Sequence, residues 1–326
     1  MKAITATEFG PPDVFSYRDA PDPAPAPDGI VIRVRAAGIS FVDLLVAQGK
    51  YQVQPPLPYV PGTEFAGEIV AVGDQVSAFK PGDRVVAGNM GGGYADLCAV
   101  PAKAAVRMPD GMSFEHGSVF RVSYGTAYYA LVQRAETQPG ETVLVLGAAG
   151  AIGTACIQMA KALGARVIAS ASSEAKRALA RQCGADEAID NNAEDWRDQL
   201  KALTAGKGVD IVVDPVGGDV TERAFRSLGW KGRHLVVGYA AGSIPKLPVN
   251  LALLKGAALV GVDYRQFGIF EPDLLTENLA RLFELYTAGK VTPPVHATHA
   301  MADFRTAMKS VIDGSATGGR VVLTNS

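Results

Sequence analysis

The hydrophobic positions of the chain follow one pattern before about residue 123 and another after it. In the first part, apolar and polar residues alternate over short runs such as GIVIRVRAAGI (29–39), as in strands with one buried face. The runs GEIVAVGDQV (67–76) and GDRVVAG (82–88) have the same character, and their Gly-Asp pairs are typical of tight turns. We therefore predict that the first part consists mainly of short β-strands.

From about residue 124 the apolar runs become nearly continuous and alternate with amphipathic segments. Strands are predicted over 141–150, 165–170, 187–190, 208–218, 233–240 and 257–264. Helices are predicted over 153–165, 173–185, 193–206 and 221–232, and beyond residue 265 over 274–289 and 301–314, before a last strand at 319–324. Strands that alternate with helices in this way predict a parallel sheet covered by helices on both faces.

The run VLVLGAAGAIG (143–153) ends a predicted strand in a turn with almost no side chains and then opens a helix. Free backbone N–H groups and the positive end of the helix dipole make such a turn a binding site for a dinucleotide pyrophosphate. The G-x-G-x-x-G spacing is incomplete, because Ala148 takes the first glycine position, next to Gly147. The alternative is a tight turn without a ligand. The predicted cofactor contacts in this turn are Ala149, Gly150, Ala151, Ile152 and Gly153.

The end of the next strand indicates which dinucleotide binds. An NAD site usually has Asp or Glu there to bind the ribose 2′-hydroxyl, but Ser170 and Ala171 occupy that place. Ser172, Ser173 and Lys176 follow, and hydroxyl and cationic groups suit a 2′-phosphate. We therefore predict NADPH rather than NADH. The alternative is that one of the two serines caps the following helix while Lys176 is merely solvated.

Composition restricts the possible partners and compartment. The chain has 326 residues, 48% hydrophobic and 20% charged, which fits a globular protein with a large core and about two domains. A net charge of −2 argues against nucleic acid as a partner, and no apolar run is long enough to span a membrane. Three widely spaced cysteines and an N-terminus without a signal peptide lead us to expect a cytoplasmic protein.

Eight segments in order along almost the whole chain resemble the zinc-free quinone oxidoreductase (zeta-crystallin-like) branch of the medium-chain dehydrogenase/reductase superfamily. They are AAGISFVDLLVAQGKY, PPLPYVPGTEFAGEIVAVG, PGDRV, GGYAD, GTAYYAL, VLVLGAAGAIGTACIQMAKALGA, VDIVVDPVGG and GGRVVL. The resemblance implies an α/β protein in which a Rossmann-type domain with a doubly wound parallel sheet (124–265) is inserted into a GroES-like β-barrel catalytic domain (1–123 and 266–326). It also implies a homodimer joined through sheet edges, with GAALVGVDY (256–264) at the interface.

The resemblance also bears on metal chemistry. Where zinc-dependent relatives use Cys and His as catalytic ligands, this chain has Ser40 and Thr63, and Val122 lies near the third ligand position. None of these is a normal zinc ligand, so we expect no metal site. Without a Lewis acid the acceptor must already be electrophilic, and we expect hydride transfer from NADPH to a quinone or another carbonyl-conjugated acceptor. The alternatives are an enoyl-thioester or acrylate-type reductase and a cofactor-binding protein with little turnover.

Three residues are candidates for the catalytic site. Tyr51 matches a tyrosine of many relatives, and its hydroxyl would hydrogen-bond the acceptor oxygen; the alternative is a tyrosine at a loop edge with its hydroxyl in water. Ser40 stands where relatives usually have Asn, and with Asp43 it has the spacing of a capping box. The cap is the favoured interpretation for Asp43, whereas for Ser40 both interpretations stay open.

Further cofactor contacts are implied by the resemblance and by the sheet topology. Tyr124 and Thr126 resemble residues that line the nicotinamide half of the cofactor, and Asn250 resembles a residue of the loop that covers it. Gly238 and Tyr239 end a predicted strand at the carboxyl edge of the sheet, where ligands gather in such folds. The alternative for each of them is ordinary turn chemistry.

Overall fold

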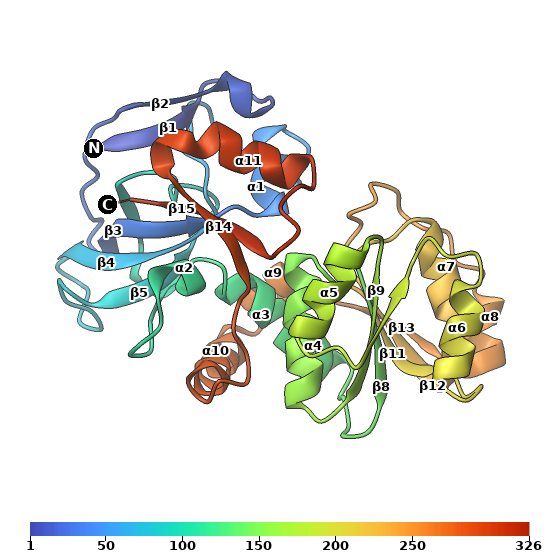
Figure 1. Cartoon of the computed structure of the whole chain (residues 1–326). Helices are drawn as coiled ribbons and strands as arrows, with labels where there is room; N and C mark the ends of the chain where they lie inside the picture. The colour runs from blue at the N-terminus through green and yellow to red at the C-terminus, as the bar shows by residue number, and fades with distance from the viewer. Residues whose placement is uncertain (326) are drawn as a thin grey trace. The chain divides into compact units, whose positions relative to one another are not determined.

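The computed structural model describes residues 1–325, which form two compact units (Figure 1). The first unit contains Met1–Arg121, Val295–Ala316 and the segment from Arg320 onward. The second contains Val122–Pro294 together with Thr317–Gly319. The second unit is therefore an insertion into the first along the chain.

The second unit is built on a six-stranded parallel sheet with the strand order of a Rossmann fold. Its strands are β8 (Thr142–Leu146), β9 (Arg166–Ala171), β10 (Glu187–Asp190), β11 (Val209–Asp214), β12 (Leu228–Val236) and β13 (Ala258–Gly261). They lie in the order β10-β9-β8-β11-β12-β13, and all neighbours are parallel. The predicted parallel sheet is thus confirmed. The order reverses between β8 and β11, and ligands bind at that point in folds of this kind.

Helices cover both faces of this sheet. Figure 1 shows α4 (Ala151–Ala162) and α5 (Glu174–Gln182) on one face, and α6 (Trp196–Leu203), α7 (Asp219–Arg226) and α8 (Asn250–Lys255) on the other. The remaining helical segments of the second unit are α3 (Arg121–Tyr128, whose first residue still belongs to the first unit), its π-helical continuation Tyr129–Arg134, α9 (Tyr264–Phe270) and α10 (Pro272–Thr287). Between the sheet and α6 to α8, Leu144, Trp196 and Phe225 are fully buried in one apolar cluster.

The helix predicted over 221–232 is shorter than expected. It ends at Arg226, and β12 already begins at Leu228, which aligns with Val209 of β11. Gly229 and Gly232 interrupt this stretch, and Lys231 has a φ of 62°, outside the helical region. Pairing with the neighbouring strand therefore determines the structure of this segment.

The second boundary between the units also differs from the expected position after residue 265. Segment 266–294, which includes α10, belongs to the second unit. The contacts explain this, because the Asn278 and Gln133 side chains exchange hydrogen bonds of 3.0 and 2.8 Å. In addition, the rings of Phe267 and Tyr129 stack with centroids 4.2 Å apart. Segment 266–294 thus packs on the helical segment that precedes β8.

The first unit consists mainly of β-strands, as predicted. Its strands are β1 (Lys2–Ala6), β2 (Phe15–Asp19), β3 (Gly29–Gly38), β4 (Glu64–Val72), β5 (Arg84–Gly88), β6 (Leu97–Pro101), β7 (Ala105–Arg107), β14 (Val295–Ala300) and β15 (Arg320–Thr324). One sheet has the order β14-β15-β3-β4-β5-β7, with β6 also paired to β3, while β1 and β2 form an antiparallel pair. The segment that brings β14 and β15 to β3 comes from the far end of the sequence.

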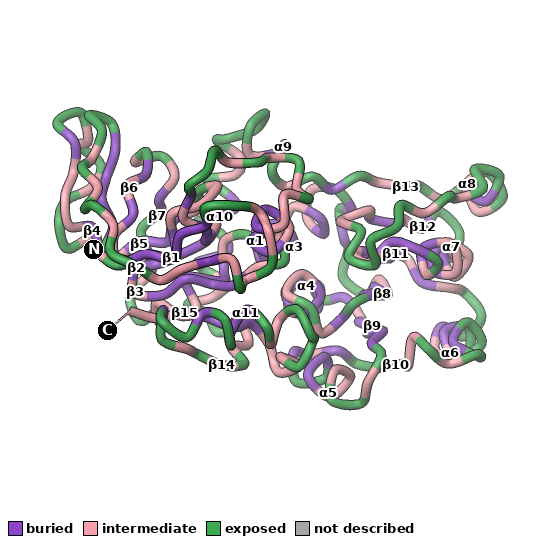
Figure 2. Tube along the Cα trace, turned by 90° about the horizontal axis from the view of Figure 1, so that it is seen from above, coloured by how far each residue is buried: buried purple, intermediate pink, exposed green. Residues whose placement is uncertain are grey.

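Short helices complete the first unit around one core. They are α1 (Phe41–Ala47), α2 (Phe114–Gly117) and α11 (Phe304–Ile312), with 3₁₀ turns at Pro12–Val14, Ala102–Ala104 and Met301–Asp303. Phe15, Phe65, Tyr94 and Phe304 are buried in this core. Figure 2 shows that buried residues are concentrated in the central strands of each sheet.

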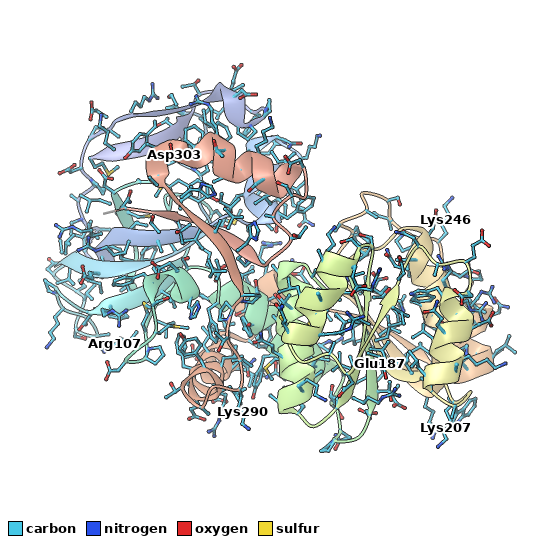
Figure 3. All side chains as sticks on the ribbon, viewed as in Figure 1. Arg107, Glu187, Lys207, Lys246, Lys290 and Asp303 are labelled. Atoms are coloured by element: carbon cyan, nitrogen blue, oxygen red, sulfur yellow. The ribbon has the colours of Figure 1, made fainter. Side chains whose placement is uncertain are left out.

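Charged side chains of both signs project from the surface of each unit. Figure 3 labels six exposed examples, namely Arg107, Glu187, Lys207, Lys246, Lys290 and Asp303. Within residues 1–325, none of the helices combines the length and the apolar composition that a membrane crossing requires.

Candidate functional site

The glycine turn between β8 and α4 lies at the point where the strand order reverses. Gly147 follows β8 with a φ of 57°, and the N–H of Gly150 donates to its carbonyl at 2.9 Å. Gly150 is the N-cap of α4 and has no side chain to cap it. The first N–H groups of this 12-residue helix therefore keep their capacity to bind an anion.

The space around each glycine separates two roles within the turn. A Cβ at Gly153 would lie 2.3 Å from the carbonyl oxygen of Gly147, so the fold itself requires a glycine there. A Cβ at Gly150 would meet only that same oxygen, at 3.2 Å, a tight contact that a shift of a few tenths of an ångström would relieve. The protein's own packing thus leaves the space beside Gly150 open, as expected if a ligand approaches the backbone there.

The loop that follows β11 lies against this turn. A Cβ placed on Gly147 would meet Cγ2 of Val216 at 3.0 Å. The N–H groups of Val216 and Gly217 donate to Oδ1 of Asp214, the last residue of β11, at 2.9 and 2.8 Å. Sequence reasoning missed Gly147 and Val216 as site residues. Their positions in the sequence could have indicated them, because Gly147 follows β8 and Val216 follows β11, and the strand order reverses between these two strands.

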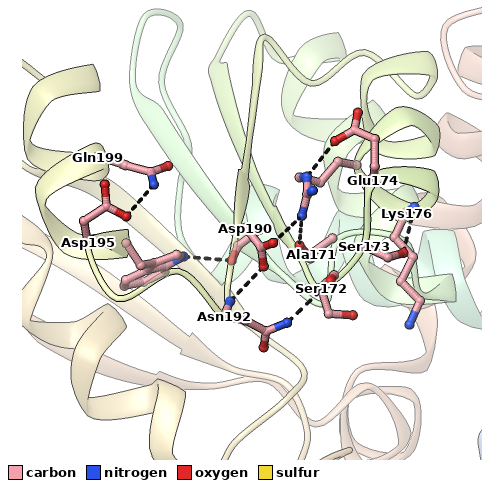
Figure 4. A network of polar contacts seen from close by, with 12 residues as sticks. Ala171, Ser172, Ser173, Glu174, Lys176, Asp190, Asn192, Asp195 and Gln199 are labelled. Carbon is pink, nitrogen blue, oxygen red and sulfur yellow. Dashed lines mark hydrogen bonds and ion pairs between the residues drawn. The ribbon is translucent and has the colours of Figure 1, made fainter.

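The predicted 2′-phosphate residues lie where β9 ends and α5 begins. Ser173 is the N-cap of α5, and its hydroxyl accepts a bond of 3.4 Å from the N–H of Lys176. Ser172 is exposed, and Figure 4 shows its side chain on the same side of the turn as that of Lys176. Among residues 1–325, the Lys176 ammonium forms no ion pair or hydrogen bond. The capping alternative therefore holds for Ser173, while Ser172 and Lys176 keep groups available for an anion.

Neighbouring charges at this position are already paired. Arg177 forms ion pairs of 3.0 Å with both Glu174 and Asp190 and donates to the carbonyl of Ala171 (Figure 4). Asn192 donates from its amide to the carbonyl of Ser172 at 3.4 Å. Sequence reasoning missed Asn192. The sequence shows a polar pair after the short strand β10, but only the pairing of β10 with β9 brings that pair to this turn.

Two other predicted cofactor residues use their side chains within the protein. Tyr124 is 1% exposed, and its hydroxyl donates to Oε1 of Gln158 in α4 at 2.8 Å. Thr126 is 6% exposed, and its hydroxyl donates to the carbonyl of Val122 at 2.7 Å. These side chains stabilise the packing of the helix that precedes β8 and offer little surface to a ligand.

The predicted residues after β12 lie at the carboxyl edge of the sheet. The N–H of Gly238 donates to the carbonyl of Asp214 at 3.3 Å, so Gly238 is held next to the end of β11. Tyr239 is 43% exposed and lies beside Gly217, whose added Cβ would meet its ring at 2.8 Å. Asn250 is exposed at the first position of α8. The carboxyl edge of the sheet thus carries the glycine turn, residues 215–218 and residues 238–239.

In the first unit, Ser40 and Asp43 form the complete capping box that their spacing predicts. The Ser40 hydroxyl accepts from the N–H of Asp43 at 3.1 Å, and the Asp43 carboxylate accepts from the N–H of Ser40 at 2.8 Å. The Ser40 hydroxyl also donates to that carboxylate at 2.7 Å. Its one proton is therefore committed to Asp43, and the Thr63 hydroxyl is 3.5 Å away.

The Asp43 carboxylate also joins two segments that are distant in sequence. It accepts from the N–H of Thr63 at 2.8 Å and from the Tyr94 hydroxyl at 3.0 Å. Burial and the charge of Asp43 raise the pKa of Tyr94 well above its usual value and that of Tyr59 to about 12. Both phenols therefore stay protonated at neutral pH. Tyr51 is partly buried and packs against the core of this unit.

The described residues contain no cluster of three or more His, Cys, Asp or Glu side chains that could hold a metal ion. Ser40 and Thr63 offer hydroxyl groups. Val122 is 37% exposed, and its side chain has no atom that could ligate a metal. This donor set does not match the nitrogen, sulfur and carboxylate ligands that zinc prefers.

The Rossmann-type unit with its glycine turn and the separate β-rich unit define a medium-chain dehydrogenase/reductase. Residues 26–110 match the family model of the alcohol dehydrogenase GroES-like domain, and residues 151–280 match that of the zinc-binding dehydrogenases. The expected GroES-like and Rossmann-type domains are thus confirmed.

Proteins that are similar in sequence show to which family within this superfamily the chain belongs. Quinone oxidoreductase-like protein 2 of Rattus norvegicus is 37% identical, with 97% of this chain and 90% of that protein covered. The quinone oxidoreductase of Homo sapiens is 31% identical, with 99% and 97% covered. The chain belongs to the quinone oxidoreductase family of medium-chain dehydrogenase/reductases and is an oxidoreductase.

Solved structures agree with this assignment over the whole chain. The Escherichia coli quinone oxidoreductase complexed with NADPH has a TM-score of 0.90 at 30% identity, and each chain is covered fully. A mycobacterial protein complexed with NADPH has a TM-score of 0.90 at 31% identity, again with full coverage of both chains. The CurK enoyl reductase has a TM-score of 0.88 at 25% identity, with 99% of this chain and 98% of that chain covered.

Proposed function

We propose that this protein is an NADPH-dependent reductase of quinones or other carbonyl-conjugated acceptors that works without catalytic zinc. The observation that carries the proposal is the open space beside Gly150 at the uncapped start of α4, together with the available Lys176 ammonium near Ser172. The complexes of two relatives with NADPH support the same cofactor.

Each part of the cofactor has a proposed partner. The N–H groups at the start of α4, in Ala151, Ile152 and Gly153, bind the pyrophosphate, with Ala149 and Gly150 leaving room for it. Ser172 and Lys176 bind the 2′-phosphate, and the amide of Asn192 donates to the carbonyl of Ser172 beside them in sequence. Gly238 and Tyr239 border the carboxyl edge of the sheet and are proposed to face the nicotinamide half, which Asn250 is proposed to cover. When bound, NADPH supplies a hydride to the acceptor.

A zinc-independent reaction follows from the residue types rather than from the name of the matching family model. Ser40 and Thr63 present hydroxyls at the two positions that zinc-dependent relatives use for metal ligands, and the Ser40 proton is committed to Asp43. A Zn²⁺ ion prefers Cys, His or carboxylate ligands. An acceptor that is already electrophilic needs no metal, because a hydrogen-bond donor is enough to stabilise the developing oxyanion.

Tyr51 is the proposed donor to the acceptor oxygen, and Ser40 and Asp43 shape the neighbouring backbone through the capping box. Replacement of Tyr51 by Phe should lower kcat by about tenfold if its hydroxyl stabilises charge in the transition state. The measurement is steady-state oxidation of NADPH with a saturating quinone. An unchanged kcat would remove Tyr51 from the reaction.

Two acceptors distinguish the quinone reductase from its alternatives. NADPH oxidation is followed at 340 nm with 1,4-benzoquinone and, separately, with crotonyl-CoA. Higher kcat/KM with the quinone supports the proposal, whereas higher kcat/KM with the thioester favours an enoyl reductase, which the similarity to CurK also suggests. NADPH binding without turnover of either compound would favour a protein that retains the cofactor with little catalysis.

A homodimer is proposed through the free edge of β13. Within residues 1–325 this strand pairs only with β12, and Leu259 on it is 53% exposed. Trp230, Leu253 and Leu254, which lie in the same part of the second unit, are 71%, 81% and 69% exposed. An apolar edge strand favours pairing with a second copy.

A cytoplasmic location stays a prediction, supported by three free, buried cysteines.

A further inference from the structure

A buried polar network lies beneath the loop that faces the glycine turn. Its centre is Asp214, the last residue of β11, which is 2% exposed. Oδ1 accepts from the N–H groups of Val216 and Gly217, and Oδ2 accepts from the Thr221 hydroxyl at 2.6 Å. The carboxylate thus fixes the conformation of residues 215–218 and ties them to α7.

His234 in β12 completes this network. Its Nε2 is 3.0 Å from Oδ2 of Asp214, and the residue is 0% exposed. Because a carboxylate has no hydrogen to give, Nε2 carries the hydrogen and donates it. Nδ1 has no partner among the described residues, and the ring lies beside Phe225 with centroids 5.8 Å apart. Within the part of the chain that the structure describes, the imidazole thus makes one hydrogen bond, the one to Asp214.

Two loops connect this network to the carboxyl edge of the sheet, where the cofactor is proposed to bind. Val216 faces Gly147 of the glycine turn, as the 3.0 Å approach of its Cγ2 to a Cβ at that glycine indicates. The backbone carbonyl of Asp214 accepts from Val237 and Gly238 at 3.0 and 3.3 Å. The N–H of Gly218 donates to the carbonyl of Ser243 at 3.1 Å. Movement of Asp214 would thus shift loops on both sides of the point where the strand order reverses.

We propose that His234 is a positioning residue for the cofactor, which through Asp214 holds residues 215–218 against the glycine turn. The proposal rests on the proposed binding of NADPH. Loss of the Nε2 donor leaves a buried carboxylate with one partner fewer, and such a carboxylate draws in water or turns toward solvent. Either response displaces Val216 from Gly147 and lowers the affinity for NADPH.

Titration calorimetry with NADPH tests this inference in four variants of the full chain. His234→Leu and Thr221→Val each remove one donor to Asp214 and should raise the Kd about tenfold, the effect of one lost hydrogen bond to a charged group. His234→Gln and Thr221→Ser keep a donor in a similar place, since the Gln Nε2 replaces that of His. We expect these two to stay within about threefold of the wild type.

A matched control separates positioning from simple loss of stability. Thr204 is 8% exposed, and its hydroxyl accepts from the N–H of Gly208 at 3.1 Å, ahead of the amino end of β11. Thr204→Val also removes a buried hydrogen bond and should lower the urea midpoint without changing the Kd. Amide hydrogen exchange in the ligand-free protein should be faster at Val216 and Gly217 in His234→Leu than in the wild type, and not in Thr204→Val.

Three outcomes would overturn the inference. A Kd unchanged in both donor-less variants would make His234 and Thr221 structural only, while the proposed function stands. Equal weakening by His234→Gln and His234→Leu would show that the Nε2 donor is not what matters. A wild type that binds no NADPH would overturn the proposed function together with this inference, and that failure is visible before any variant is made.

Discussion

At the scale of single residues, Lys176 is the clearest test of cofactor choice. Its ammonium forms no ion pair within residues 1–325, so its removal breaks no internal ion pair. Lys176→Ala should raise the Kd for NADPH about tenfold, the effect of one charge-assisted hydrogen bond, and leave the Kd for NADH nearly unchanged. Titration of both nucleotides by intrinsic fluorescence measures the difference.

The control for this prediction lies on the same helix. Arg181 is also cationic, but it pairs with Glu174 at 2.8 Å and is separated from Lys176 by more than one turn of α5. Arg181→Ala should leave both affinities within about twofold of the wild type, since it removes a similar charge from a different place. Equal losses for NADPH and NADH in Lys176→Ala would contradict a role in binding the 2′-phosphate.

Asp214 makes stability depend on pH in a defined direction. Burial acts to raise its pKa, but hydrogen bonds from His234, Thr221 and Gly217 outweigh burial and hold the pKa below its usual value. A carboxyl with a lowered folded pKa stabilises the fold fully above the unfolded pKa of about 3.9 and loses this contribution as the pH falls through the folded pKa.

We therefore expect the free energies of unfolding of the wild type and Asp214→Asn to differ by a constant amount from pH 7 to about 5. Below about pH 4 the difference should shrink, because protonation makes the wild-type carboxyl resemble the amide. Urea unfolding at each pH measures it. Asp303→Asn, at an exposed position, serves as the control. A difference that grows in acid would refute the assigned direction.

Local spacing predicted some site residues well and distant ones poorly. The Ser40 and Asp43 capping box and the Ser173 cap depend on residues three apart, so the sequence reveals them. The bond from Tyr94 to Asp43 crosses 51 positions, and no local pattern indicates it. Asn192 was missed for the same reason, because only strand pairing brings β10 beside β9.

At the scale of elements, the glycine turn separates folding from binding. Gly153→Ala places a Cβ 2.3 Å from a backbone oxygen and should lower the free energy of unfolding by about 1–3 kcal/mol, as overpacking does. Gly150→Ala meets only one oxygen at 3.2 Å and should change stability by less than about 1 kcal/mol. Its methyl group nevertheless occupies the space proposed for the pyrophosphate, so NADPH binding should weaken at least about tenfold.

Urea unfolding and NADPH titration on the same two variants check this separation. The result would contradict the proposed phosphate site if Gly150→Ala bound NADPH as tightly as the wild type. A stable Gly153→Ala would instead mean that the turn can shift to accept a side chain. The glycine motif predicts that Gly150 lets the backbone approach the phosphates and that Gly153 lets the helix pack close to the sheet. The distances to the carbonyl of Gly147 show how differently crowded the two positions are.

Element type was predictable wherever burial enforces a regular pattern. The strands from β8 to β11 and the helices α4 to α6 agree with the expected runs, because both faces of a parallel sheet are apolar. The prediction was wrong where pairing overrides helix propensity, since 228–232 belongs to β12 and not to α7. Segment 295–300 forms β14 although its histidines and threonine lack a strong apolar alternation.

At the scale of the whole molecule, the inserted arrangement came from the resemblance and not from periodicity. The apolar pattern indicates one β-rich part and one α/β part, but it cannot tell that β14 and β15 pair with β3 near the other end of the chain. The same limit explains why residues 266–294 were assigned to the first unit. A helix such as α10 has an apolar face that fits either unit, and only specific partners such as Gln133 decide between them.

The free edge of β13 leads to the prediction for the assembled protein. A second copy that pairs β13 with β13 around a two-fold axis would satisfy the unpaired edge and cover Leu259, which is 53% exposed. Leu259→Asp puts a charge on this strand and should convert a dimer into monomers, as analytical ultracentrifugation at micromolar concentration would measure. Ile312→Asp changes a similarly exposed residue of the first unit, 49% exposed, and should leave the dimer intact. A wild type with the mass of one subunit, or a Leu259→Asp variant that still dimerises, would exclude this edge as the interface.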